Sequence, residues 1–221
     1  MSSKYLNDSR APQVRARPRG RPRDPERMAR VIEAAEAQFS EHGYEGASID
    51  AIAVSSGVSK VTIYSYFPTK ADLFRHAITH RVESQFAEVD WARLDPGRPR
   101  EALSQIGRAF LRLMRSADVI KKHRTLYGTQ GLDSAAAESY FAAGPQKLVE
   151  ALAGYLASAH QAGSLQVNDA PLAANQFLSM FLGLGQIRAQ LGLSLPSKRE
   201  DDELLKANVE LFIRGTARKL K

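Results

Sequence analysis

Apolar residues recur at helical spacing through most of the chain, and no segment shows the sustained apolar–polar alternation that marks a strand. In the first such segment Met28, Val31, Ala35 and Phe39 fall on one face of a helix. We therefore predict an all-α fold. After a first helix over residues 25–42 and two short ones within 48–67, we expect helices over 69–89, 103–113, 119–127, 134–142, 145–162, 171–191 and 198–217.

Residues with strong end preferences mark several of these boundaries. Asp24 is a good N-cap for the first helix, Pro25 fits its first position, and Gly43 is placed to stop it. Thr69, with Asp72 three residues on, has the spacing of a capping box.

The segment from Ser48 to Lys70 is typical of two short helices joined by a tight turn at Gly57, with a third helix opening after Pro68. An apolar face is formed by Ile49, Ile52, Ala53, Val58, Ile63 and Phe67. The second helix leaves hydrogen-bonding and cationic side chains pointing outward. This is the outline of a helix-turn-helix, which places its second helix in the DNA major groove. A protein-binding helical hairpin is the alternative.

Within this unit the residue types suggest separate roles on DNA. Lys60 and Thr62 suit base edges, and the hydroxyls of Tyr64 and Tyr66 suit the backbone. The full set that we expect to contact DNA is Ser48, Ser59, Lys60, Thr62, Tyr64, Ser65, Tyr66 and Lys70. Ser48 and Lys70 stand at helix starts, where phosphate contacts are favoured.

Positive charge is concentrated before Asp24. Seven basic residues against one acid give this segment +6 of the chain's formal +7. It is rich in Pro and Arg and poor in apolar residues, so we expect disorder in isolation. Its core, Arg17-Pro-Arg-Gly-Arg-Pro22, resembles an AT-hook, in which Arg19 and Arg21 would reach into a narrow A·T minor groove. We expect Arg17 to contact DNA as well. The alternative is a solvated tail that adds only non-specific attraction.

Several classes of protein are disfavoured. The sequence contains no run of about 18 uncharged apolar residues, so we expect no membrane span. It has no apolar stretch near the N-terminus, so we expect no secretory signal. The chain has no cysteine, which fits a reducing, cytoplasmic location. No phosphate-binding Gly motif, HExxH helix or nucleophile elbow is present. We expect no enzyme, no catalytic residues and no cofactor.

Two further sets of residues are candidates for binding a metal ion or a small molecule. His76 and His80 are spaced to share a helix face, but no supporting carboxylate lies between them, so we predict a capping or solvent-facing role and no metal. Aromatic and Met residues on the central helices could line an apolar pocket or simply fill the core. The first candidates for ligand contact are Phe110, Met114, Tyr155 and Phe177.

Many spaced positions together resemble the TetR family of bacterial one-component repressors. They are Ile52-Ala53, Gly57-Val-Ser-Lys60, Thr62-Ile-Tyr64, Tyr66-Phe67 and Lys70, preceded by a helix that ends in Phe39 and Gly43-Tyr44. Val61 departs from the pattern, because the family often has a small residue there, and this bears on helix insertion and base preference. The segments 143–146, 162–165 and 173–177 look similar to an AefR-like C-terminal domain.

The resemblance implies a homodimer formed through the last two helices, a double-stranded DNA operator that is pseudo-palindromic, and a small-molecule effector that releases it. Gly183, Gly185, Ala189 and Gly192 would let a partner helix approach closely, although a monomer's central core is the alternative. We expect a basic arm over 1–23, a DNA-binding domain over 24–70 and a ligand-binding and dimerisation domain over 71–221. A competing function is an A·T-preferring architectural protein led by the arm.

Overall fold

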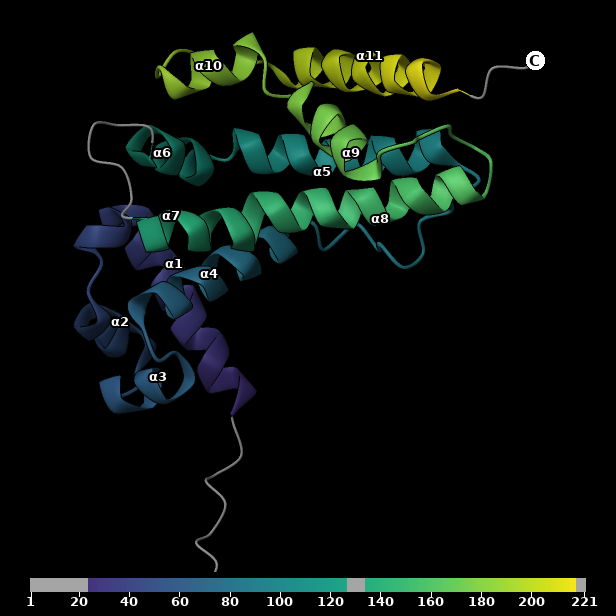
Figure 1. Cartoon of the computed structure of the whole chain (residues 1–221). Helices are drawn as coiled ribbons and strands as arrows, with labels where there is room; N and C mark the ends of the chain where they lie inside the picture. The colour runs from purple at the N-terminus through teal and green to yellow at the C-terminus, as the bar shows by residue number, and fades with distance from the viewer. Residues whose placement is uncertain (1–23, 127–133, 218–221) are drawn as a thin grey trace, which may run out of the picture.

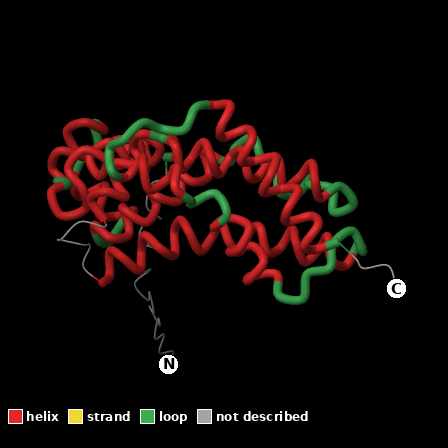
Figure 2. Tube along the Cα trace, turned by 90° about the horizontal axis from the view of Figure 1, so that it is seen from above, coloured by secondary structure: helices red, strands yellow, loops and turns green. Residues whose placement is uncertain are grey.

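The computed structural model describes residues 24–126 and 134–217, and this part of the chain is helical without any strand, which confirms the predicted all-α fold. The elements are α1 (Pro25–Gly46), α2 (Ile49–Ser56), α3 (Lys60–Tyr66), α4 (Lys70–Gln85), α5 (Pro99–Arg115), α6 (Ala117–Leu126), α7 (Ser134–Phe141), the π-helical η1 (Ala142–Gln146), α8 (Lys147–Gln161), α9 (Ala170–Ser179), α10 (Leu184–Gln190) and α11 (Lys198–Thr216). Figure 2 shows the same helices from above, joined by loops. None of these described helices is long and apolar enough to cross a membrane.

A small head and a longer body lie at two ends of the molecule (Figure 1). The head contains α1, α2, α3 and the start of α4. In the body α11 packs on α5, α9 packs on α8, and α10 contacts α6. The layer of α10 and α11 is farthest from α3, so the head presents α3 at the opposite end of the molecule from these last helices.

Each part has its own apolar cluster. In the head, Val31 and Phe39 of α1, Ile52 of α2 and Ile63 of α3 are almost fully buried. This cluster also takes in α4 as far as Ile78. The body cluster is centred on α5, α8 and α9 and includes Leu103, Ile106, Leu152, Leu156, Phe177 and Phe181. The start of α4 therefore packs with the head, and the division after residue 70 stays a prediction.

The predicted helix ends are present in the head. The Asp24 side chain accepts a hydrogen bond from the backbone N–H of Arg27, and Thr69 with Asp72 forms the capping box. Regular helical backbone breaks at Gly43, where φ is 71°. The helix that follows the capping box ends at Gln85, four residues earlier than expected, because the chain turns where Phe86 enters the body core.

The single long helix predicted over 171–191 is wrong. The chain forms α9, a turn and α10, with extended backbone at Gly183 (φ −73°, ψ −157°). The turn lets Phe181 insert fully into the body core, against Phe177 and Phe110. Gly185 then lies so close to Pro196 that an added Cβ would stand 2.9 Å from its ring.

The expected start of a separate helix at Pro145 is also wrong. α7, η1 and α8 follow one another without a break, and Pro145 lies inside the π-helical turn (Figure 1). Proline lacks an N–H and its ring clashes with the carbonyl four residues back, and a wider turn relieves that conflict. Ala143 and Gly144 of this turn are buried and lie over α4.

Candidate nucleic-acid interface

The helix α3 is fixed from behind by apolar burial. Val58, Ile63 and Phe67 are each no more than 3% exposed and pack in the head cluster. Gly57 ends α2 in the left-handed conformation (φ 66°), and Ser59 caps α3 by accepting a hydrogen bond from the backbone N–H of Thr62. These features hold α3 at one angle against α2, with its other face toward solvent.

The outward face of α3 carries a cation that already has a partner. The Lys60 ammonium lies 2.9 and 3.0 Å from the two carboxylate oxygens of Asp50 on α2. Hydrogen bonding to and attraction by Asp50 raise the pKa of Lys60, so the amine is charged. Both side chains are well exposed, and such a pair contributes little to stability because water screens it. Asp50 is not among the predicted site residues, since ten residues separate it from Lys60 in the sequence.

Three hydroxyls of the predicted set are engaged within α3 itself. The hydroxyls of Ser59 and Thr62 lie 2.8 Å apart, and the Ser65 hydroxyl donates to the Thr62 carbonyl at 2.6 Å. The Tyr64 side chain is 41% exposed. The structure thus brings Ser59, Lys60, Thr62, Tyr64 and Ser65 together on one short helix.

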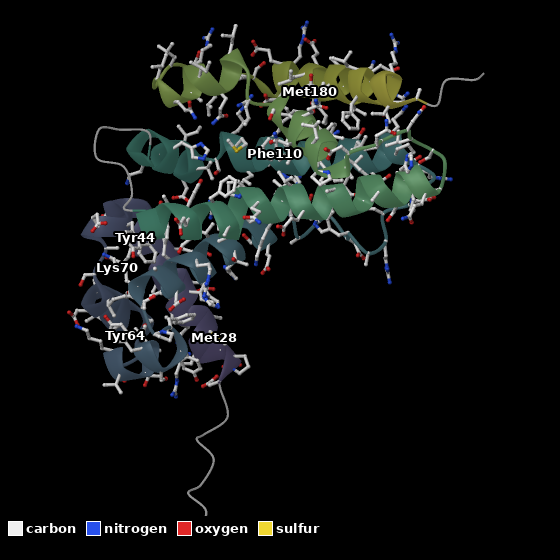
Figure 3. All side chains as sticks on the ribbon, in the orientation of Figure 1. Met28, Tyr44, Tyr64, Lys70, Phe110 and Met180 are labelled. Carbon is white, nitrogen blue, oxygen red and sulfur yellow. The ribbon has the colours of Figure 1, made fainter. Side chains whose placement is uncertain are left out.

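The remaining predicted residues are Tyr66, at the end of α3, and Ser48 and Lys70 beside this helix. Ser48 caps α2 by accepting from the backbone N–H of Ala51. The Tyr66 hydroxyl accepts from the backbone N–H of Asp24, which ties α3 to the start of α1. Lys70 donates to the Glu45 carbonyl at 3.0 Å, and its ammonium stands 5.0 Å from the centre of the Tyr44 ring (Figure 3).

One cation near the turn, Arg30, is not among the predicted site residues. The Arg30 guanidinium on α1 donates to the Ser56 carbonyl at 3.3 Å, beside the turn between α2 and α3. Only the crossing of α1 and α2 brings it there, so no local pattern signals it. The predicted arm residues Arg17, Arg19 and Arg21 lie outside the described residues.

His76 and His80 do not share a partner, although both lie on α4. His76 Nδ1 lies 2.8 Å from the Asp72 carbonyl oxygen, while His80 Nδ1 lies 2.6 Å from the Glu36 carboxylate on α1. Within the residues that the structure describes, no group of three or more potential ligands is placed to hold a metal ion.

The four candidate ligand residues are all buried in the body core. Phe110 and Phe177 meet through Phe181, whose ring centre is 6.1 Å from that of Phe110 and 5.3 Å from that of Phe177. Met114 follows Phe110 by one turn of α5. Tyr155 donates its hydroxyl to the Asp95 carbonyl at 3.1 Å, and burial raises its pKa to about 12, so it is a neutral donor.

A charged network joins the last helices to this core. Arg115 of α5 binds Asp201 of α11 at 3.1 Å and the Gln186 side-chain oxygen of α10 at 2.6 Å. The Arg115 side chain is only 10% exposed and that of Asp201 18%. The Arg115 guanidinium lies 3.2 Å from the place where a Cβ on Gly185 would stand, so this glycine leaves room for it.

Body and head also meet through α6 and α7. The Tyr140 ring of α7 stacks on Phe74 of α4, with 6.4 Å between ring centres. The Tyr140 hydroxyl lies 3.1 Å from His123 Nε2 of α6, and burial lowers the pKa of that histidine. Arg81 of α4 pairs with Asp118 of α6 at 3.6 Å. A shift of α6 or α7 would therefore change the contacts that these helices make with α4.

Family models match both parts of the chain. The model described as bacterial regulatory proteins, tetR family, matches residues 31–77, which span α1 to the middle of α4. The model described as AefR-like transcriptional repressor, C-terminal domain, matches residues 101–215, just over half of the chain. The chain belongs to the TetR family of DNA-binding transcriptional regulators. Neither match supports the architectural alternative.

Curated HTH-type transcriptional repressors resemble part of this chain. A transcriptional repressor from Streptomyces coelicolor, SCO4008, is 43% identical over 61 residues, 27% of this chain and 32% of that protein. The repressor KstR of Mycolicibacterium smegmatis is 35% identical over 79 residues, 36% of this chain and 39% of its own. The matches thus span about a third of these relatives' length.

Solved structures resemble the whole fold. The flavonoid-responsive regulator FrrA is 30% identical, with a TM-score of 0.69 over 89% of this chain and all of that one. A TetR regulator from Agrobacterium tumefaciens, at 20% identity, has a TM-score of 0.70 over 89% of this chain and 97% of its own. The second likeness concerns the fold alone.

Proposed function

We propose that this TetR-family protein is a homodimeric repressor that binds a pseudo-palindromic operator through α3 of each protomer and leaves it when a small molecule binds the body. The observation that carries this proposal is α3, whose apolar back is buried while Lys60, Tyr64 and Ser65 point to solvent. A fixed helix with an outward polar face is what major-groove binding requires.

On DNA the roles divide by position on the head. Lys60 and Thr62 read base edges, and Lys60 exchanges Asp50 for acceptors on guanine. Tyr64, Ser65 and Tyr66 of α3 and its N-cap Ser59 hold phosphates, together with Ser48 and Lys70 beside the helix. Arg17, Arg19 and Arg21 add attraction to the neighbouring minor groove.

The dimer forms through the exposed apolar surface of the last helices. Leu184 is 79% exposed, and further exposed side chains of α9, α10, α11 and the loop between the last two are Leu172, Ile187, Leu191, Leu193, Leu195 and Leu211. Exposed large apolar side chains gathered on one set of elements are typical of protein contacts. Two heads on one dimer then match the two halves of a palindrome.

The effector enters the body core around Phe110, Met114, Tyr155 and Phe177. It favours the state whose heads do not fit the operator, so it shifts the population by its differential affinity. Because FrrA is described as flavonoid-responsive, flavonoids are the first probes. Thermal shift of the protein with a flavonoid panel, repeated with Phe177→Ala, tests this part.

The central experiment selects bound duplexes from genomic fragments with the full-length protein, followed by footprinting. We expect one inverted repeat protected on both halves. Enrichment of A·T-rich DNA without a repeat would contradict the proposal. Lys60→Ala should protect the repeat only at about tenfold higher protein concentration, while Lys206→Ala, an exposed lysine on α11, should protect it as wild type does.

A separate measurement addresses the arm. Deleting residues 1–23 removes seven basic residues, so the slope of log affinity against log salt should fall by several units, at about 0.9 for each phosphate that the arm neutralises. An unchanged slope would show that Arg17, Arg19 and Arg21 bind no phosphate.

A further inference from the structure

The outward face of α3 holds one apolar side chain among polar ones. Val61 is 82% exposed and belongs to neither apolar cluster. Two residues of an α-helix turn about 200°, so Val61 lies almost opposite the buried Ile63. Its neighbours on the exposed face are Lys60, Tyr64 and Ser65. Val61 thus occupies the middle of the surface that the proposed function assigns to DNA.

Nothing in the folded head explains a valine at this position. It gains no packing there, and a β-branched residue is a weaker helix former than alanine. Its branched methyl groups remain in water in the DNA-free protein. The position therefore has an apolar group available only to an outside partner.

Few groups on DNA can make an apolar contact with this side chain. Of the groups on base edges in the major groove, only thymine presents a methyl, and apolar side chains contact it. The polar residues beside Val61 can donate hydrogen bonds to phosphates and to acceptors on the bases, but they gain no apolar contact with a methyl group. We infer that Val61 reads the 5-methyl group of a thymine in each operator half-site and so sets the base preference at one T·A pair. This inference rests on the proposed DNA binding.

A matched control exists on the neighbouring helix. Val54 of α2 is 84% exposed and lies two residues from the buried Ile52, as Val61 lies two residues from Ile63. Random-sequence duplexes are selected with full-length wild type, Val61→Ala and Val54→Ala. We expect one T·A pair per half-site whose enrichment is lost in Val61→Ala and kept in Val54→Ala. Both variants should melt within a few degrees of wild type, since neither side chain is packed.

The decisive measurement removes only the methyl group. In the selected duplex each thymine is replaced in turn by deoxyuridine. Wild-type affinity should fall about three- to fivefold when this thymine is replaced in one half-site, the value of roughly one buried methylene, and about 10- to 20-fold when it is replaced in both. Val61→Ala should not respond, and 5-methylcytosine in place of that thymine, paired with guanine, should restore part of the wild-type affinity.

Other outcomes overturn the inference in distinguishable ways. Wild type that is indifferent to deoxyuridine at every position, or an equal penalty in Val61→Ala, removes the methyl contact while specific binding stands. A Val61→Ala variant that binds all duplexes more tightly shows that Val61 only obstructs. Wild type that enriches no sequence at all overturns the proposed function, and the inference with it.

Discussion

Two helices of seven residues, α3 and α10, show opposite arrangements of polar and apolar side chains. In α3 the apolar Ile63 is buried and Lys60, Tyr64 and Ser65 are exposed. In α10 the polar Gln186 is buried, at 3% exposure, and Leu184 is exposed. The first has its polar face outside and the second its apolar face.

Neither helix is long enough to persist alone, because short helices are marginal in water. Each therefore depends on one anchor: α3 on the apolar head cluster, α10 on the network with Arg115. The kind of contact that anchors a short helix is thus independent of the kind of side chain that its outward face carries. Polar groups outside suit DNA, and leucines outside suit a second copy of the chain.

The largest expected effect comes from charging the outward face of α10. Leu184→Glu with Ile187→Glu should give monomers in sedimentation velocity, because carboxylates would be buried at the proposed interface. Operator affinity should fall by about 100-fold or more, since the second head no longer binds at high effective concentration. Phe141→Glu, an exposed apolar site on α7, is the control. A double variant that stays dimeric contradicts the assignment of this face.

Next comes the anchor of α10. Arg115→Ala leaves Asp201 and Gln186 without their partner in a mostly buried site, so the free energy of unfolding in urea should fall by about 2–3 kcal/mol. Arg108→Ala breaks an exposed pair with Asp202 between the same two helices and should cost about 0.5 kcal/mol or less. Equal losses would mean that burial of the first pair is unimportant.

A smaller effect is expected on the polar face of α3. Lys60→Ala should weaken operator binding about tenfold, the discrimination of one base contact. Asp50→Asn should act in the other direction on random duplexes, because it frees Lys60 and removes a negative charge that faces phosphate. Its salt slope should steepen by about one unit. Fluorescence anisotropy across a salt series checks both, and identical responses would exclude a role for the pair.

The smallest expected effect is on stability, at the glycines that precede α3 and α10. Gly57 has φ of 66° and Gly183 has φ of −73°, and neither has any atom within 4 Å of an added Cβ. Gly57→Ala should therefore lower the free energy of unfolding by about 1–2 kcal/mol through backbone strain alone. Gly183→Ala should cost about 0.5 kcal/mol or less, because its backbone suits alanine. Thermal melts of the two variants measure the difference.

The head could be predicted from the sequence because its signals agree. The N-caps at Asp24 and Thr69, the turn at Gly57 and the apolar spacing around Ile63 all favour the same helices. The pairing of Lys60 with Asp50 could not be predicted, since it depends on the angle at which α2 meets α3.

The helices over residues 171–191 of the body are harder to predict from the sequence, for a physical reason. The exposed Leu184 of α10, the buried Phe177 of α9 and the buried Phe181 between them are all apolar, so the pattern over 171–191 matches one continuous helix. The break depends on Phe181 entering the core and on Arg115 passing beside Gly185. Both are contacts between distant segments, which spacing along the chain does not reveal.

The π-helical turn between α7 and α8 sets a rotational phase. One residue of an α-helix corresponds to about 100° of rotation, and a π turn accommodates one residue more than an α turn. The face that α7 turns to α4, with Tyr140 on Phe74, is thus offset from the face that α8 turns to α9. Deleting one residue from 142–146 would rejoin the two as an ordinary helix and rotate Tyr140 away from the head. Among relatives, a gap of one residue here would therefore coincide with a change in the residues by which body and head meet.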